Sequence, residues 1–130
     1  MPHIVLDYSA NLDDRFDMYG LCTALKDAAA ATGVFPPAGI RVRAHAAQHS
    51  VVADGDRRHG FIDITIRLAA GRTDAQKAKA TNAIFDAATA FTADHMAQQP
   101  FMLSLELREI DATHSRKTSS IRDYLPPEMH

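Results

Sequence analysis

The sequence predicts an α+β domain in which two β-α-β units form a mostly four-stranded sheet with two helices on one face. Three observations support this fold class: the order strand–helix–strand occurs twice, the expected strands alternate apolar and polar residues, and each helix joins two strands of one unit. Such a crossover makes the joined strands parallel. We expect a single domain over residues 1–130, with the first unit at 1–52, the second at 61–110 and a C-terminal tail at 111–130.

The first unit begins with the alternating segment 3–8, HIVLDY. Asn11 or Asp13 is expected to cap a following helix that ends near Ala31. Gly33 fits the position just after a helix, and the two prolines that follow prevent the helix from continuing. In the next segment, IRVRAHA, the arginines and the histidine share one strand face while valine and alanine share the other.

The second unit contains the clearest strand, FIDITIRL at 61–68, in which aliphatic residues occupy every second position. Thr73 and Gln76 match the capping-box pattern of a helix that is expected to run to about Met96. The segment 101–110, FMLSLELREI, alternates again and completes the unit. The polar tail is expected to form a short helix near residues 119–125 or to contact a neighbouring subunit.

The second face of the sheet is expected to be uncovered, because both helices lie on the first. Asp63, Thr65 and Arg67 project from this face. This pattern favours a subunit interface over contact with bulk solvent.

Composition excludes several classes of function. The net charge of −2 argues against a nucleic-acid partner, which requires a basic stripe. No run of about 18 apolar residues predicts a membrane span, and the N-terminus has no signal-peptide pattern. The single cysteine, Cys22, cannot form an internal disulfide, which favours the reducing cytoplasm.

Pro2 has two possible interpretations. A proline lacks the N–H of a strand ladder and is tolerated at the first position of a strand. Alternatively, removal of the initiator methionine would make Pro2 a free secondary amine. An α-amine titrates at about 7.7–8, and burial or nearby cations lower this pKa. A base with a pKa near neutrality is suited to proton abstraction beside a carbonyl group.

Arg41 and Arg72 are candidate anion-binding residues. Arg72 precedes Thr73 at the expected start of a helix, where free N–H groups and the helix dipole favour an anion. A guanidinium group adds a bidentate contact for a carboxylate. The alternative is that both are solvated surface arginines. No metal-ligand spacing appears among the histidines, and no glycine-rich phosphate loop is present, so neither a metal nor a cofactor is expected.

Five segments together resemble the 5-carboxymethyl-2-hydroxymuconate isomerase family of the tautomerase superfamily, whose members include relatives of macrophage migration inhibitory factor. These segments are MPHIV, ATGVFPPAGIRVRAH, ADG, AAGR and LSLELREID. The resemblance implies a homotrimeric, cofactor-independent cytoplasmic enzyme of aromatic-compound degradation in the homoprotocatechuate pathway. It also implies that Pro2 is the general base and then the general acid, and that Arg41 and Arg72 bind a carboxylated dienol substrate.

Two other functions remain open at this level. A hydratase or dehalogenase of the same superfamily would use Pro2 as a charged acid. A non-enzymatic trimeric binding protein would keep the fold without the chemistry. The sequence alone identifies neither the natural substrate nor the role of the tail.

Overall fold

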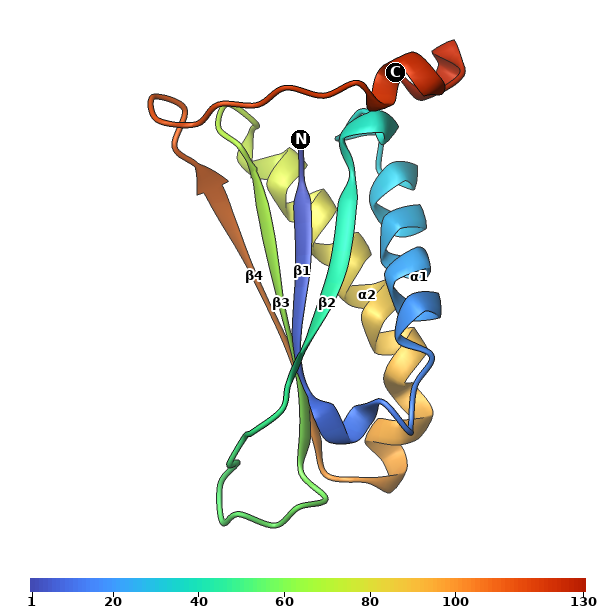
Figure 1. Ribbon diagram of the computed structural model, residues 1–130, viewed down its shortest axis with the longest axis vertical. Coiled ribbons are helices and arrows are strands. Elements are labelled where there is room, and N and C mark those ends of the chain that lie inside the picture. Colours follow the sequence, from blue (N-terminus) through green and yellow to red (C-terminus); the bar gives the residue numbers. More distant parts are fainter.

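Four strands form one mixed sheet, and two long helices cover one of its faces in the computed structural model, which describes all 130 residues (Figure 1). The strands are β1 (His3–Ser9), β2 (Arg41–Ala47), β3 (Gly60–Ala69) and β4 (Phe101–Ile110); the α-helices are α1 (Met18–Ala31) and α2 (Asp74–Gln98); and 3-10 turns lie at η1 (Ala10–Leu12), η2 (Pro37–Gly39), η3 (Ile121–Tyr124) and η4 (Pro127–Met129). The strand order is β2-β1-β3-β4. Each β-α-β unit contains a parallel pair, and the two units join through the antiparallel pair β1 and β3. The predicted fold class is therefore confirmed.

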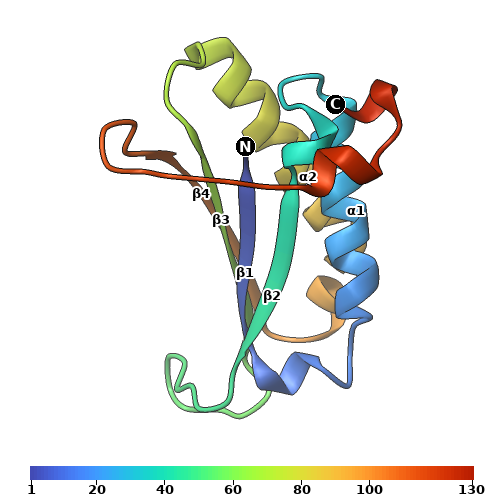
Figure 2. The same ribbon diagram turned by 45° about the horizontal axis from the view of Figure 1, so that its top comes forward.

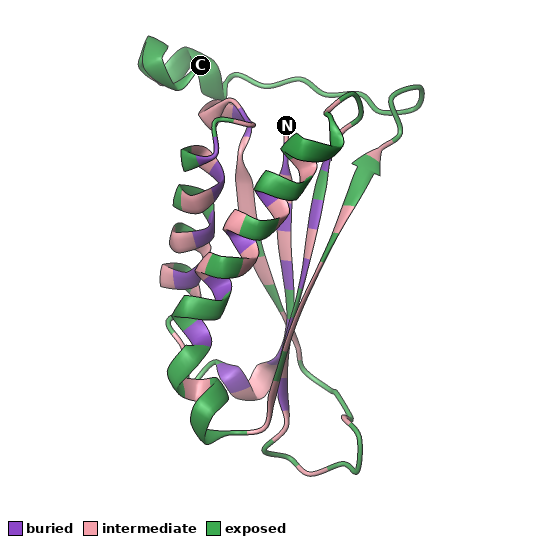
Figure 3. Cartoon of the chain, turned by 180° about the vertical axis from the view of Figure 1, so that it is seen from behind, coloured by how far each residue is buried: buried purple, intermediate pink, exposed green.

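The hydrophobic core lies between the sheet and the two helices. Every second residue of β3 points into it, and Ile62, Ile64 and Ile66 are completely buried. Figure 3 shows the same alternation of buried and exposed positions along the sheet. Leu21 on α1 and Ile84 on α2 are completely buried against these strands. Each such side chain contributes about 1.5–3 kcal/mol through removal from water.

The start of α2 confirms the predicted capping box. The Thr73 hydroxyl accepts a hydrogen bond from the Gln76 N–H at 3.1 Å, and the Gln76 side-chain oxygen accepts one from the Thr73 N–H at 3.0 Å. Both contacts lie within one turn, so the local sequence determines them.

The predicted cap of the first helix is wrong. α1 is capped by Asp17, whose carboxylate accepts from the Gly20 N–H at 2.9 Å. The Asn11 amide instead donates to two carbonyls of the loop before β3, at 3.1 and 2.9 Å. Asp13 accepts the Tyr8 hydroxyl at 2.6 Å. Both side chains that were expected to cap the helix are therefore engaged in other contacts.

The C-terminal tail crosses the end of the sheet at which β1 begins (Figures 1 and 2). It leaves β4, passes the N-terminus and reaches the side of η2 and β2. Residues 111–124 are exposed along this path. The turn η3 lies inside the 119–125 range where a short helix was expected. No helix of the chain has the length and apolar character needed to cross a bilayer.

Candidate active site

The N-terminus lies at the end of a central strand, because β1 has β2 on one side and β3 on the other. Pro2 directly precedes β1 and its side chain is buried. The Pro2 carbonyl accepts a hydrogen bond from the Arg41 N–H at 3.1 Å. Pro2 is thus held at the edge of the β1–β2 ladder at a position where its missing N–H is tolerated.

A pocket of about 270 Å³ adjoins the N-terminus. Met1, Ala38, Gly39 and Arg41 form its sheet side, and the tail forms the opposite wall with Lys117, Thr118, Ser119 and Arg122. Met1 packs against Gly39: a Cβ atom built at Gly39 would lie 3.4 Å from the Met1 Cα, at van der Waals contact. No carboxylate lines the pocket.

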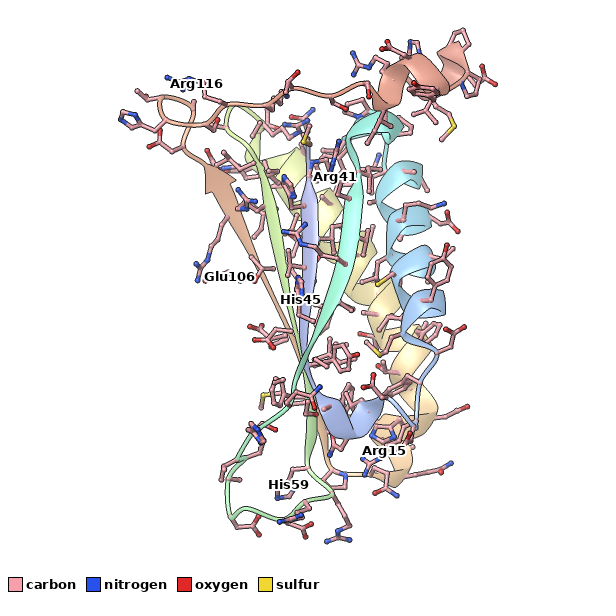
Figure 4. All side chains as sticks on the ribbon, in the orientation of Figure 1. Arg15, Arg41, His45, His59, Glu106 and Arg116 are labelled. Atoms are coloured by element: carbon pink, nitrogen blue, oxygen red, sulfur yellow. The ribbon has the colours of Figure 1, made fainter.

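Arg41, a candidate anion-binding residue of the sequence analysis, lines this pocket. It is the first residue of β2, paired with His3, and Figure 4 shows it beside the start of β1. Its Nη1 donates to the Gly39 carbonyl at 2.9 Å. This contact uses one edge of the guanidinium group and orients it, while the remaining donors are left for a ligand.

Arg72 approaches the N-terminus from the helix-covered side and does not line the 270 Å³ pocket. Its Nε donates to the Val34 carbonyl at 3.4 Å and its Nη1 to the Ala69 carbonyl at 3.3 Å. The guanidinium carbon lies 5.2 Å from the centre of the Phe35 ring, a cation–π distance. The Thr73 hydroxyl next to Arg72 caps α2 by accepting a hydrogen bond from the Gln76 N–H.

The electrostatics of this region disfavour a charged amine. The pKa of the N-terminal amine, carried here by Met1, is lowered first by burial and then by the positive charges of Arg72, Lys117 and Arg41. None of these three cations takes part in an ion pair. An amine with a lowered pKa is suited to accept a proton, and the uncompensated cations around it attract anions.

Lys117 and Arg122 are pocket residues that sequence reasoning missed. The tail carries no periodic apolar pattern from which its path could be inferred. The one signal was the presence of several basic residues in an otherwise polar segment, and only the fold brings them to the N-terminus.

A larger cavity of about 510 Å³ lies at the other end of the sheet, under the loop before β3. Of its lining residues, Asp56 and His59 have charged partners within that loop, whereas Arg57 forms no ion pair. Asp56 pairs with Arg58 at 2.7 Å, and His59 pairs with Asp54 at 2.7 Å. The N-terminal pocket, which is lined by three basic side chains and by no carboxylate, is the stronger candidate for an anionic substrate.

The two β-α-β units, with the pocket at the N-terminal end of their sheet, define the fold class of the protein. A more distant solved structure, described as a Q0 fused 4-OT wild type symmetric trimer, shares the fold with a TM-score of 0.65 and 21% identity, covering 85% of this chain and 87% of that one. The chain belongs to the 5-carboxymethyl-2-hydroxymuconate isomerase family, whose model matches residues 2–125.

Individual relatives agree with this assignment. The 5-carboxymethyl-2-hydroxymuconate Delta-isomerase of Escherichia coli is 31% identical over 121 residues, which are 93% of this chain and 96% of the relative. A crystal structure of an enzyme of that name has a TM-score of 0.89 and 30% identity, covering 95% of this chain and 92% of that one. The crystal structure of a 5-carboxymethyl-2-hydroxymuconate isomerase from Deinococcus radiodurans R1 has a TM-score of 0.87 and 29% identity. The match covers 96% of this chain and 95% of that one. The resemblance seen in the sequence is confirmed, and the chain is an isomerase.

Proposed function

We propose that this isomerase converts a carboxylated 2-hydroxydienoate, of the 5-carboxymethyl-2-hydroxymuconate type, into its unsaturated ketone without a cofactor. The substrate class follows the names of the family and of the relatives. The observation that carries the mechanism is the amine at the N-terminus, which lies beside three cations and has a lowered pKa.

In this proposal Pro2 becomes the N-terminal residue once Met1 is removed. Its neutral secondary amine accepts the proton of the 2-hydroxyl group. The O–H electrons form the C=O bond, the conjugated double bond shifts, and the prolinium ion returns a proton to the distal carbon. The step is balanced, since one proton is accepted and one is delivered.

Arg41 and Arg72 hold the anionic groups in this mechanism. Negative charge develops on the 2-oxygen as its proton leaves, and a fixed guanidinium group near that oxygen stabilises the transition state. The remaining arginine binds a substrate carboxylate through a bidentate contact. The same two charges keep the amine neutral, which links substrate binding to the strength of the base.

The assembly we propose is a homotrimer in which the uncovered face of the sheet meets other copies. Its support is that face itself, where Asp63 and Arg67 are exposed and no helix of the chain covers them. We also propose that the enzyme acts in the cytoplasm, in the homoprotocatechuate branch of aromatic-compound degradation. The single free cysteine is the residue-level support for that compartment.

The test is an ultraviolet assay that follows loss of the dienol of 5-carboxymethyl-2-hydroxymuconate, with mass spectrometry to confirm that Pro2 is N-terminal. We expect Pro2→Ala to lower kcat by on the order of 10²–10⁴, the usual contribution of a positioned base. A matched control retains one residue before Pro2, which preserves the side chain but converts the amine to an amide.

The control should lose activity at least as completely as Pro2→Ala. Absence of turnover in the processed wild-type protein would overturn the proposed substrate. Full activity in both altered forms would overturn the proline mechanism. A Pro2 amine that is charged at neutral pH would favour the hydratase or dehalogenase chemistry, which needs an acid.

A further inference from the structure

The tail contributes two cations to the pocket that have no structural role of their own. Neither the Lys117 ammonium nor the Arg122 guanidinium takes part in an ion pair or a side-chain hydrogen bond within the chain. Both residues are exposed, so packing does not explain their positions. They nevertheless line the same wall, opposite Arg41 and beside the N-terminus.

The charge of Lys117 acts directly on the site. Among the charges that lower the pKa of the N-terminal amine it ranks after Arg72 and ahead of Arg41. A tail residue is thus electrostatically as much a part of the pocket as an arginine of the sheet. The tail cations and Arg41 repel one another. An anion bound between them offsets this repulsion, so we expect it to stabilise the position of the tail.

A count of charges on the proposed substrate suggests what this anion is. The 5-carboxymethyl-2-hydroxymuconate skeleton carries three carboxylates, one of which is bonded to the carbon that bears the 2-oxygen. In the proposed mechanism the arginine at the 2-oxygen also faces this carboxylate, and the other arginine binds a second one. A third carboxylate without a cation would be desolvated at a cost when the pocket closes. The other cations that line the pocket belong to the tail, so we expect the third carboxylate to lie beside the tail.

We infer that Lys117 and Arg122 form a third carboxylate subsite, and that the tail thereby selects tricarboxylate over dicarboxylate dienols. This inference rests on the proposed function and specifies its substrate class. The carboxylate at the tail is remote from the atoms that exchange protons. Its binding energy is therefore the same in the ground state and the transition state, and it affects KM and leaves kcat unchanged.

The experiment compares two substrates with Lys117→Ala, Arg122→Ala and the conservative Lys117→Arg. The substrates are 5-carboxymethyl-2-hydroxymuconate and 2-hydroxymuconate, which lacks the carboxymethyl group. Loss of one charge-assisted contact at an exposed position predicts about a tenfold rise in KM for the tricarboxylate. The dicarboxylate should change little, and Lys117→Arg should restore most of the affinity.

Arg116→Ala is the matched control. Arg116 neighbours Lys117, has the same charge and lies at the far end of the tail from Arg41 in Figure 4. It donates to the carbonyls of Thr113 and Ser115 and does not line the pocket. Circular dichroism checks that each variant remains folded.

Three outcomes would overturn the inference. The first is an unchanged KM in both Lys117→Ala and Arg122→Ala, and the second is an equal change in KM for the two substrates. The third is an equal change in KM in Arg116→Ala, which would indicate general charge attraction. Failure of the proposed function is distinguishable, because the wild-type protein would then turn over neither substrate. A second readout is the pH profile, in which Lys117→Ala moves the acidic limb of kcat/KM to higher pH for both substrates because a repelling charge is lost. The KM values of the two substrates are therefore compared at a pH above this limb.

Discussion

Replacing Arg72 with glutamine removes the charge that lowers the pKa of the N-terminal amine more than any other charge does. The guanidinium group is fixed by the Val34 and Ala69 carbonyls and by the Phe35 ring 5.2 Å away. Two of its five N–H donors are engaged in these contacts, so three remain for an anion. The group is therefore oriented before substrate arrives, which is the condition for effective charge stabilisation.

The expected loss follows from this geometry. Removing one preorganised donor from an enclosed site costs about 10²–10³ in kcat. Arg72 is only partly buried, so we expect the lower end of that range, about 10²-fold in kcat/KM or ~2.7 kcal/mol of transition-state stabilisation. Loss of the cation–π contact should also lower the free energy of unfolding by about 0.5–1 kcal/mol.

The assay is the dienol absorbance measured across pH, with Arg72→Lys beside Arg72→Gln. The pKa of the N-terminal amine, carried by Met1 in the structure, is lowered by burial and by nearby cations. We expect the same cations to lower the pKa of a Pro2 amine, so that its neutral form persists to lower pH. Glutamine removes a repelling charge and raises that pKa, which moves the acidic limb of kcat/KM to higher pH. Lysine keeps the charge, so the limb should stay near its wild-type position while the rate still falls through loss of the planar fork.

Wild-type kcat/KM in Arg72→Gln would refute the assignment of Arg72 to the site. An unchanged acidic limb in the glutamine variant would refute the electrostatic part of the reasoning, even if the rate fell.

Three predictions concern stability. Ile64→Ala truncates a completely buried side chain in the central sheet and should lower the free energy of unfolding by about 2–5 kcal/mol in urea titration. Asp17→Ala removes the carboxylate that accepts from the Gly20 N–H and should cost about 1 kcal/mol in the same titration. The hydrogen bond to Asp13 raises the pKa of Tyr8 from 10.0 to about 12. The folded state then holds this proton more tightly than the unfolded chain, so the stabilisation is present below pH 10 and is lost as the pH rises towards about 12. Unfolding titrations across that interval should show the decline in wild type and a weaker one in Tyr8→Phe.

Each of these has a result that contradicts it. A loss below 1 kcal/mol in Ile64→Ala would mean that the core closes over the deleted atoms. If Asp17→Ala is as stable as the wild type, the Asp17 cap does not contribute to the stability of α1. An identical decline above pH 10 in wild type and Tyr8→Phe would assign the pH dependence to other groups.

Local sequence was sufficient for much of the fold. The alternation in β3 places Ile62, Ile64 and Ile66 on one face whatever the neighbouring strands are. The Thr73–Gln76 capping box involves residues within one turn, so no distant segment is needed to form it. The strand–helix–strand order of both units also limits the possible topologies to a few.

The start of α1 could not be read in the same way. Asn11 and Asp13 are both good capping residues, but they bond to the loop before β3 and to Tyr8. Side chains of this kind have several possible backbone and side-chain partners, and the folded chain determines which partner is within reach.

The same distinction applies to the candidate site. The sequence by itself indicated Pro2, Arg41 and Arg72 as candidates, through their positions before strands and a helix and through the family resemblance. Only the tertiary structure placed Lys117 and Arg122 beside them, because the tail has no apolar periodicity and its path depends on where β4 ends. Hydrophobic pattern determines which elements form, whereas the convergence of charges from distant segments is a property of the folded chain alone.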